Sequence, residues 1–449
     1  MNCIHFFSSK ILRICCTILF LGGIVNNFFA QNSDNSTKSF AESPVKYVSS
    51  NFENATPLFW ELNPDGSVLV HLVYDHERNT PNRASNHVHF QIQAKPNSDV
   101  TLVIQYFDEV WNARIATSHS LLKNYYISHD GVSWTTVPVE IFENGHKIHV
   151  RVQSSGVFYV SGMEPYRISD LDKLLNEIRN KPSVEIEPIG KTVEGRQLEI
   201  VRIGKPTAPF RVFIRARAHP WEAGGNWLVQ GMIKYLLDKN TDKKYLDRYC
   251  VYILPMAAKD GVARGLTRFN SFGIDLNRGM NLPADPYLTP ENHALEAWLK
   301  KMIDREMRPN VSIDLHNDRN GKLSFGHPSN INKPDYNTDK VNSTFQEGYL
   351  IMDKNADVKQ YESNIAKFES LMYKYTWYTW TQGGVRKDAS NSGNYSTRRY
   401  HVDIAGLLEL NQTWIERLNK APFGSDWELM GKQMCDVFYH YFDDAGSKK

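Results

Sequence analysis

Four short apolar runs, separated by longer amphipathic stretches, constrain the fold of this chain more than any other feature. They are Arg211–Arg215, Cys250–Leu254, Val311–Leu315 and Gly406–Leu410. Runs of this length suit buried strands, and the stretch after the first run has Leu228, Met232, Tyr235 and Leu236 at helical spacing. Strands that alternate with helices favour an α/β sheet domain. We therefore expect such a domain in the second part of the chain.

A different pattern fills the part of the chain before this domain. In Asn86–Ala94 one strand face carries apolar residues and the other carries polar ones, respectively Val88, Phe90, Ile92, Ala94 and His87, His89, Gln91, Gln93. Such alternation predicts a half-buried strand. Asp130-Gly131 and Asn144-Gly145 lie between apolar runs, where these dipeptides favour hairpin turns. We predict a small antiparallel β-sandwich, with His87 and His89 on its solvated face rather than bound to a metal.

The pattern changes again near Glu164-Pro165-Tyr166. Ser169 and Asp172 have the spacing of a helix cap, and an apolar stripe follows them. We therefore divide the chain into a signal peptide (1–30), a polar linker (31–45), a β-sandwich domain (46–163) and an α/β domain (164–449).

The first thirty residues have the pattern of a secretory signal. Lys10 and Arg13 precede an apolar run that ends near Val25, and this run is shorter than the roughly 20 residues that span a bilayer. We expect an exported protein, periplasmic or extracellular, without an integral membrane segment once the signal is removed. A membrane anchor is the rival interpretation. A lipidated Cys15 or Cys16 is disfavoured, because each has a bulky neighbour where a small residue usually precedes a lipidated cysteine.

Charge and cysteine content narrow the possible partners. The net charge of +2 becomes 2 − 2 = 0 once Lys10 and Arg13 leave with the signal, so no electrostatic case for nucleic-acid binding exists. Cys250 and Cys435 are the cysteines that remain, and the sequence leaves open whether they pair.

Two histidines and a glutamate stand where open α/β sheets gather their sites. His219 and Glu222 follow the first predicted strand of the domain, and His316 ends a later one. Catalytic zinc takes three imidazole or carboxylate ligands and leaves a fourth position for water. A His-x-x-Glu alone is common by chance, and a single His at a strand end is more often structural. The pattern needs further context.

That context comes from the residues that follow in order. Asp260-Gly261, Arg268, the stretch Asp275–Arg278 and finally Glu409 complete a series in which the chain resembles the zinc metallocarboxypeptidase family. The resemblance runs from about residue 165 to the C-terminus, and the β-rich segment resembles the domain ahead of the enzyme in cytosolic-carboxypeptidase-like members. It implies a mixed, mostly parallel twisted sheet with helices on both faces and zinc at its carboxyl edge.

The resemblance also implies a role for each matched residue. One zinc per chain would be held by His219, Glu222 and His316, with Glu409 as general base towards a zinc-activated water. Arg268 would stabilise the oxyanion, whereas Asn277 and Arg278 would bind the free C-terminal carboxylate of a peptide substrate. Asp275 would hold the far nitrogen of His219. The implied reaction is hydrolysis of the C-terminal peptide bond.

Some positions depart from the family pattern. Trp221 replaces a small residue between the ligands, and Ala258-Lys259 replace an Asn-Pro. We interpret Trp221 as a packing residue, and likewise the aromatic stretch Tyr373–Trp380. Tyr395 and Tyr400 are too near Glu409 to serve as the family's mobile tyrosine. Four basic residues precede Glu409, namely Arg386, Lys387, Arg398 and Arg399. They indicate either a preference for substrates with an acidic C-terminal residue or simply an exposed basic loop.

Two other functions stay open at this stage. One is a zinc amidase of the same fold that acts on peptidoglycan stem peptides or acylated amino acids. The other is a catalytically idle binding protein that uses the sandwich to hold a carbohydrate or protein partner. The oligomeric state and the natural substrate do not follow from the sequence.

Overall fold

The chain is described here by a computed structural model. It covers residues 42–78, 82–111, 113–116, 122–142, 145–241, 243–278, 283–319, 321–325, 358–378, 385–386 and 402–443. The expected signal peptide lies outside these residues. Phe40–Lys449 belong to one structural unit. Among the helices of the described ranges, none has both the length and the apolar character needed to cross a bilayer.

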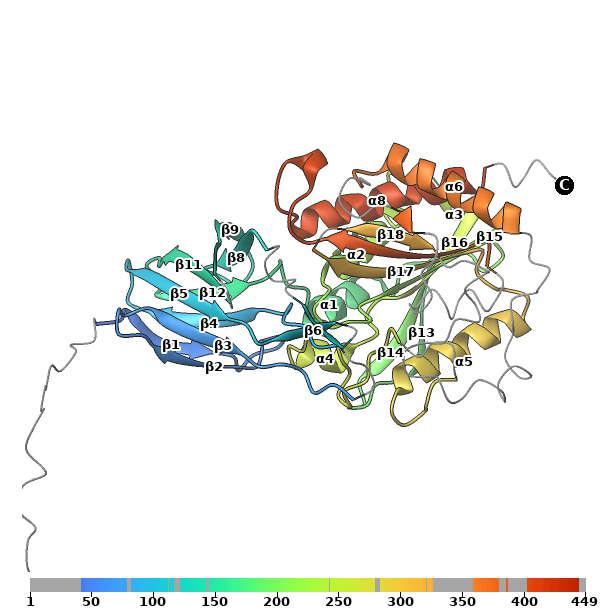
Figure 1. The fold of residues 1–449 in the computed structure, drawn as a ribbon. Coiled ribbons are helices and arrows are strands. Elements are labelled where there is room, and N and C mark those ends of the chain that lie inside the picture. Colours follow the sequence, from blue (N-terminus) through green and yellow to red (C-terminus); the bar gives the residue numbers. More distant parts are fainter. Residues whose placement is uncertain are drawn as a thin grey trace, which may run out of the picture. The chain divides into compact units, whose positions relative to one another are not determined.

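Two five-stranded sheets make up the N-terminal part of the described chain (Figure 1). The first contains β1 (Val45–Ser49), β4 (His89–Ala94), β12 (Val157–Ser161), β8 (Asn124–Ser128) and β9 (Thr135–Pro138), in that order. The second contains β10 (Glu140–Phe142), β11 (Gly145–Arg151), β5 (Asp99–Gln105), β3 (Val68–Leu72) and β2 (Leu58–Leu62). Side chains of both sheets share one apolar core, so the predicted sandwich is confirmed. Its strands pair antiparallel, except that β3 and β5 run parallel.

The turn between β8 and β9 forms as its sequence predicts. Asp130 Oδ1 accepts the N–H groups of Val132 at 2.8 Å and Ser133 at 2.7 Å, and Gly131 has a φ of 74°. Bonds of this kind between a short acidic side chain and the backbone two residues on stabilise tight turns.

The predicted solvated face of His87 and His89 is wrong. Both side chains are buried, at 7% and 0% exposure, because residues of the second domain and of a neighbouring loop cover them. The backbone N–H of His87 donates to Thr267 Oγ1 at 3.3 Å, and its Nε2 lies 2.8 Å from the carbonyl oxygen of Asn54. Burial lowers the pKa of His87 to about 4, so this imidazole is neutral at physiological pH.

Two short elements, a hairpin and a helix, are not part of the two sheets of the sandwich. The hairpin of β6 (Glu109–Trp111) and β7 (Arg114–Ala116) forms a small sheet of its own. Helix α1 (Ile168–Ile178) begins one residue before Ser169, so the predicted cap is misplaced. The carboxylate of Asp170, not Asp172, accepts the N–H of Arg167 at 2.8 Å.

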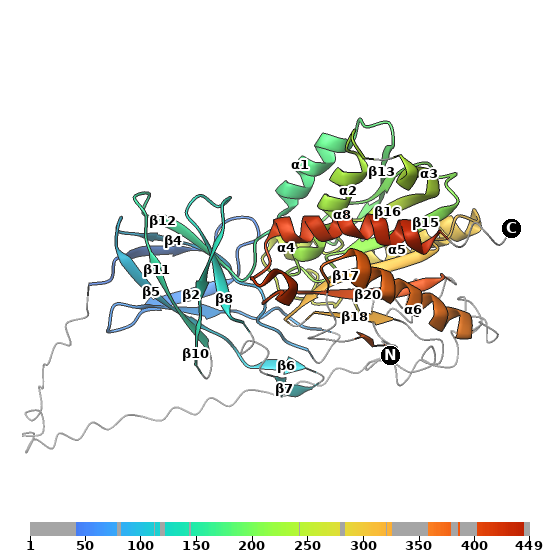
Figure 2. The same cartoon turned by 90° about the horizontal axis from the view of Figure 1, so that it is seen from above.

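In the described part of the second domain, eight strands form one mixed sheet (Figures 1 and 2). Their order is β13 (Val184–Lys191), β14 (Gln197–Ile203), β16 (Tyr249–Leu254), β15 (Phe210–Ala216), β17 (Val311–Asp318), β20 (Ile404–Asn411), β18 (Lys322–Phe325) and β19 (Val385–Arg386). The four predicted strands are β15, β16, β17 and β20. They lie side by side and run parallel, as expected.

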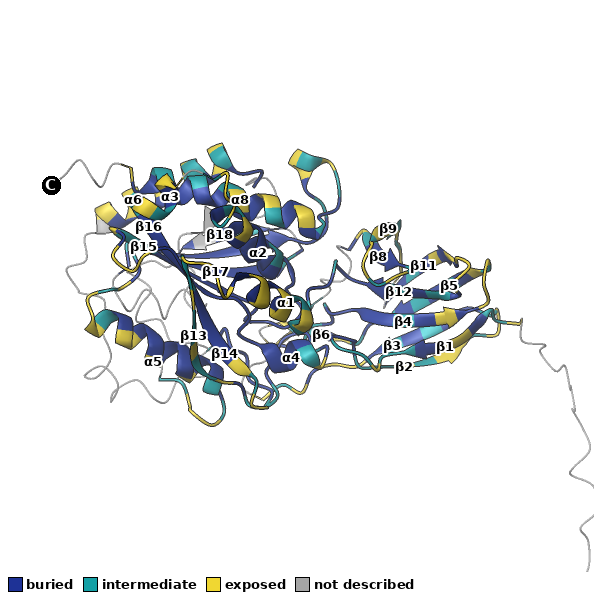
Figure 3. Cartoon of the chain, turned by 180° about the vertical axis from the view of Figure 1, so that it is seen from behind, coloured by how far each residue is buried: buried dark blue, intermediate teal, exposed yellow. Residues whose placement is uncertain are grey.

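Helices cover both faces of this sheet, and the burial pattern shows why (Figure 3). On β16, Val251 and Ile253 join the core beneath α1, α2 (Gly224–Leu236), α3 (Lys244–Arg248), α6 (Val358–Tyr375) and α8 (Gly424–Tyr441). Cys250 and Tyr252 on the same strand join the core beneath α5 (Pro290–Asp304). A short α4 (Lys259–Ala263) follows β16.

Cys250 and Cys435, whose pairing the sequence leaves open, do not form a disulfide. Cys250 and Cys435 are both free and fully buried. They belong to the cores on opposite faces of the sheet, since Cys435 lies on α8. The sheet therefore separates the two thiols.

We predict that the close crossing of α2 and α8 makes Gly431 intolerant of a side chain. An added Cβ would lie 1.9 Å from the carbonyl oxygen of Leu228 in α2, so the helices would have to separate. Gly431→Ala should lower the free energy of unfolding by about 1–3 kcal/mol, because overpacking outweighs the gain in helix propensity. Ser425→Ala, at an exposed position of α8, is the matched control in urea unfolding. Equal stability of both variants would contradict this packing.

Candidate active site

Three side chains converge at the carboxyl edge of the central strands. His219 and Glu222 lie on the loop between β15 and α2, and His316 lies on β17. His219 Nδ1 is 2.8 Å from Glu222 Oε1, His316 Nδ1 is 2.8 Å from Glu222 Oε2, and the two Nδ1 atoms are 3.2 Å apart. All three residues are buried. The structure thus brings together the predicted ligand set.

A carboxylate supports the far nitrogen of each imidazole. His219 Nε2 lies 3.1 Å from Asp275 Oδ1, as expected, and His316 Nε2 lies 3.1 Å from Asp314 Oδ2. Asp314 also accepts two bonds from the buried guanidinium of Arg215, at 2.8 and 2.7 Å. These contacts fix both rings so that Nδ1 is the atom presented to the site.

The charges of the cluster favour a cation. Burial would raise the pKa of Glu222, yet the imidazoles of His219 and His316 lower it to about 2. Burial would lower the pKa of His316, yet Asp314 and Glu222 raise it to about 10. Without a metal, a proton on His316 therefore balances these carboxylates. A metal ion that binds here would displace this proton.

The donor set fits zinc. The ligand atoms of His219, Glu222 and His316 all lie within 4.8 Å of one another. Bonds of about 2.05 Å in a tetrahedron place ligand atoms about 3.3 Å apart, close to the 3.2 Å between the two Nδ1 atoms. Imidazole and carboxylate are ligands that zinc prefers.

Glu409 stands beside the ligand cluster on β20. In the parallel pair β17 and β20 it is the register partner of His316, and in the antiparallel pair β18 and β20 it is the partner of Lys322. Lys322 Nζ lies 3.8 Å from Glu409 Oε1, while Glu409 Oε2 is buried and has no hydrogen-bond partner among the described residues. Burial raises the pKa of Glu409 to about 6, although Lys322 lowers it.

Arg268, Asn277 and Arg278 lie on the loop that carries Asp275. Arg268 Nε donates to Asp275 Oδ2 at 2.7 Å, so one carboxylate joins this guanidinium to His219. Asn277 Oδ1 accepts a bond from Arg215 at 3.1 Å. Arg278 is partly exposed, and its Nε is buried without a hydrogen-bond partner among the described residues.

Some residues near the site escaped the sequence-based prediction. Asp314 and His316 share one face of a strand, so an Asp-x-His pattern could have identified this carboxylate. Lys322 carried no such signal. The same holds for Asp75, whose carboxylate accepts the backbone N–H groups of Thr267, Arg268 and Phe269 at distances between 2.5 and 3.1 Å.

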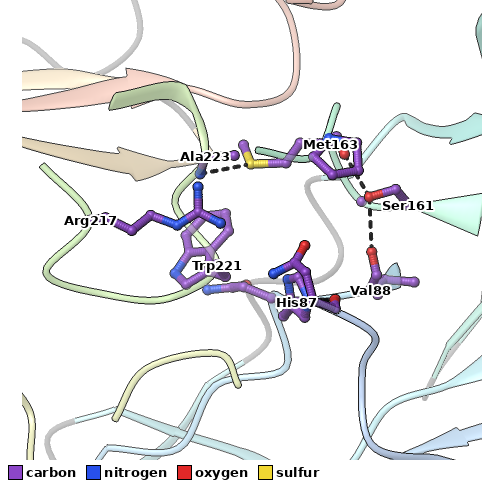
Figure 4. A pocket seen from close by; sticks show the side chains of 11 residues that line it. His87, Val88, Ser161, Met163, Arg217, Trp221 and Ala223 are labelled. Carbon is purple, nitrogen blue, oxygen red and sulfur yellow. Dashed lines mark hydrogen bonds between the residues drawn. The ribbon is translucent and has the colours of Figure 1, made fainter. Parts of the chain in front are cut away.

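Trp221 is a packing residue, as predicted. Its side chain is 4% exposed and belongs to the core of the second domain. It lines a small pocket together with Arg217, Met163 and His87 (Figure 4). Trp377 and Tyr378 are likewise buried in the core, whereas Tyr373 is 51% exposed. Lys387, Tyr395, Arg398, Arg399 and Tyr400 lie outside the described residues.

Comparison with known proteins agrees with this geometry. Residues 171–417, more than half of the 449-residue chain, match the family described as zinc carboxypeptidase. The chain belongs to the zinc carboxypeptidase family. Zinc is thus the metal that both the family and the donor set indicate.

Similar proteins include cytosolic carboxypeptidases. Cytosolic carboxypeptidase 3 of Mus musculus is 25% identical over 319 residues, 66% of this chain and 29% of that protein. Cytosolic carboxypeptidase 6 of Mus musculus is 25% identical over 254 residues, 55% of this chain and 42% of that protein. The matched regions therefore span less than half the length of these relatives.

Solved structures share the fold. A metallo-carboxypeptidase from Pseudomonas aeruginosa has a TM-score of 0.71 at 18% identity, and the alignment covers 89% of this chain and all (100%) of that one. A metallo-carboxypeptidase from Burkholderia cenocepacia gives 0.70 at 18% identity, with 89% and 99% covered. At this coverage the likeness extends into the N-terminal domain. The boundary near residue 163 stays a prediction.

We predict that Asp275→Asn weakens zinc binding without unfolding the protein. The amide cannot supply the negative charge that orients His219, and loss of such a partner typically weakens metal affinity about 10–100-fold. The dissociation constant can be measured by competition with a chelating dye. Asp304→Asn, at the exposed end of α5, should bind zinc like the wild type. An unchanged constant for Asp275→Asn would show that this carboxylate does not support the ligand.

Proposed function

We propose that this protein is an exported zinc metallocarboxypeptidase that hydrolyses the C-terminal peptide bond of peptides. The observation that carries the proposal is the three-ligand cluster of His219, Glu222 and His316, with Glu409 in register beside His316. A bound zinc lowers the pKa of a coordinated water towards about 7 and polarises a carbonyl group.

The neighbouring side chains supply the remaining chemistry. Glu409 acts as general base, because its carboxylate has a pKa of about 6, near the pH at which a base is most effective. It takes a proton from the attacking water and passes it to the leaving amine. Arg268 lies across Asp275 from His219 and supports the negative charge that develops on the carbonyl oxygen.

The other end of the substrate is a free carboxylate. Arg278 can meet it with a guanidinium fork, and Asn277 adds an amide whose oxygen is held by Arg215. A carboxylate-binding group of this kind favours exopeptidase action, since an internal peptide bond presents no carboxylate there. The Pseudomonas aeruginosa neighbour is described as a complex with (2-guanidinoethylmercapto)succinic acid, a dicarboxylic acid, which suits a site of the same chemistry.

We expect Glu409→Gln to keep its zinc and to lose turnover. A positioned base contributes about 10²–10⁴-fold to rate, so the variant should fall by at least that factor on a C-terminally randomised peptide library. His316→Ala should lose both zinc and activity, and Glu177→Gln, on the exposed face of α1, should lose neither. Retained turnover in Glu409→Gln would refute its role. If the protein cleaves muropeptides but not the peptide library, it is a zinc amidase rather than a carboxypeptidase.

Export is the part of the proposal that rests on the sequence alone. Lys10 and Arg13 followed by an apolar run support it, although the relatives compared above are named cytosolic. Expression of the full chain in a bacterial host followed by fractionation and N-terminal sequencing tests it. We expect a processed protein that begins near Gln31. An intact N-terminus on protein in the cytosolic fraction would contradict export.

A further inference from the structure

The N-terminal domain reaches the substrate-binding arginines through one aromatic ring. Trp111 ends β6, and its side chain is 42% exposed although it is large and apolar. Its ring centroid lies 4.7 Å from Cζ of Arg268 and 5.9 Å from Cζ of Arg278. Both distances fall within the roughly 6 Å over which a cation is attracted to an aromatic face. One indole therefore contacts two guanidinium groups.

The positively charged groups around this ring could bind an anion. Arg268 has a carboxylate partner in Asp275, but that carboxylate is also engaged by His219 and by the backbone N–H of Asn277. Burial lowers the pKa of Arg268, and the like charge of Arg278 acts in the same direction. Among the described residues, Asp275 is thus shared by several donors, and the partly exposed guanidinium of Arg278 suits a carboxylate from a ligand.

The backbone around Arg268 is held in place by the same N-terminal domain. Asp75 accepts N–H groups from Thr267, Arg268 and Phe269. A Cβ on Gly265 would lie 1.9 Å from the carbonyl oxygen of Ala55, and one on Gly273 would lie 2.0 Å from that of His76. These backbone contacts stand on both sides of Arg268, so the placement of Trp111 over its side chain is part of a fitted surface.

We propose that Trp111 is a positioning residue of the substrate site, supplied by the N-terminal domain. Its indole holds Arg278 in the orientation that receives the C-terminal carboxylate of a peptide, and it holds Arg268 beside it in the orientation that faces the carbonyl oxygen. This inference rests on the proposed function. It assigns the sandwich domain a direct part in recognition of the substrate, because the ring lies against the partly exposed guanidinium of Arg278 and would limit where that group can move.

The test measures recognition of the carboxylate without turnover. In zinc-loaded full-length Glu409→Gln protein, calorimetry gives the dissociation constants of a short peptide with a free C-terminus and of the same peptide with a C-terminal amide. The free acid should bind more tightly. Adding Trp111→Ala should reduce that preference about tenfold, which corresponds to about 1.4 kcal/mol.

Further variants separate positioning from simple loss of structure. Trp111→Phe keeps an aromatic face and should keep most of the preference, whereas Trp111→Leu keeps apolar area only and should lose it like Trp111→Ala. Phe59→Ala removes another exposed aromatic residue of the same domain, 58% exposed on β2, and should change nothing. Zinc content and thermal unfolding should stay the same in all of them.

The outcomes distinguish this inference from the proposed function. An unchanged preference in Trp111→Ala overturns the role of Trp111 and leaves the carboxypeptidase intact. If the parent protein binds the acid and the amide equally, both the carboxylate site and the role of Trp111 are wrong. A lost preference in Trp111→Ala that Trp111→Phe restores supports the proposal.

Discussion

The parallel hydrogen-bonded register of β15, β17 and β20 is the constraint on which the site depends. It places Ala216 opposite Leu315, and His316 opposite Glu409, so residues about a hundred positions apart in the chain end at one edge of the sheet. A shift of a single residue would turn a side chain to the other face. The buried apolar residues on both faces prevent such a shift, since each face packs against its own layer of helices.

Ion pairs between buried side chains also organise the site at this edge of the sheet. Each imidazole is backed by a carboxylate, and each carboxylate is backed by a guanidinium, Asp275 by Arg268 and Asp314 by Arg215. Buried ions are tolerated when every one of them is paired and hydrogen-bonded. The carboxylates thereby help to place the two rings, and Asp275 also joins His219 to the guanidinium of Arg268.

Much of the fold and of the ligand set followed from the sequence, and the reasons are local. The four central strands are continuous apolar runs, and the ligands follow or end such runs. Where the prediction was wrong, the sequence pattern was ambiguous. The start of α1 was predicted from Ser169 and Asp172, but Arg167 and Asp170 have the same spacing and form the cap. The burial of His87 and His89, and the contacts of Asp75 and Trp111 with the Arg268 loop, depend on how two domains meet. No periodicity within one segment carries that information.

The fit between Gly265, Gly273 and the carbonyl groups of the N-terminal domain has a consequence for how this architecture can be rearranged. A catalytic domain whose Arg268 loop fits closely against a neighbouring domain is not a transferable module. If the sandwich were exchanged for that of another family member, different backbone atoms would lie against this loop, and the close fit at Gly265 and Gly273 would be lost.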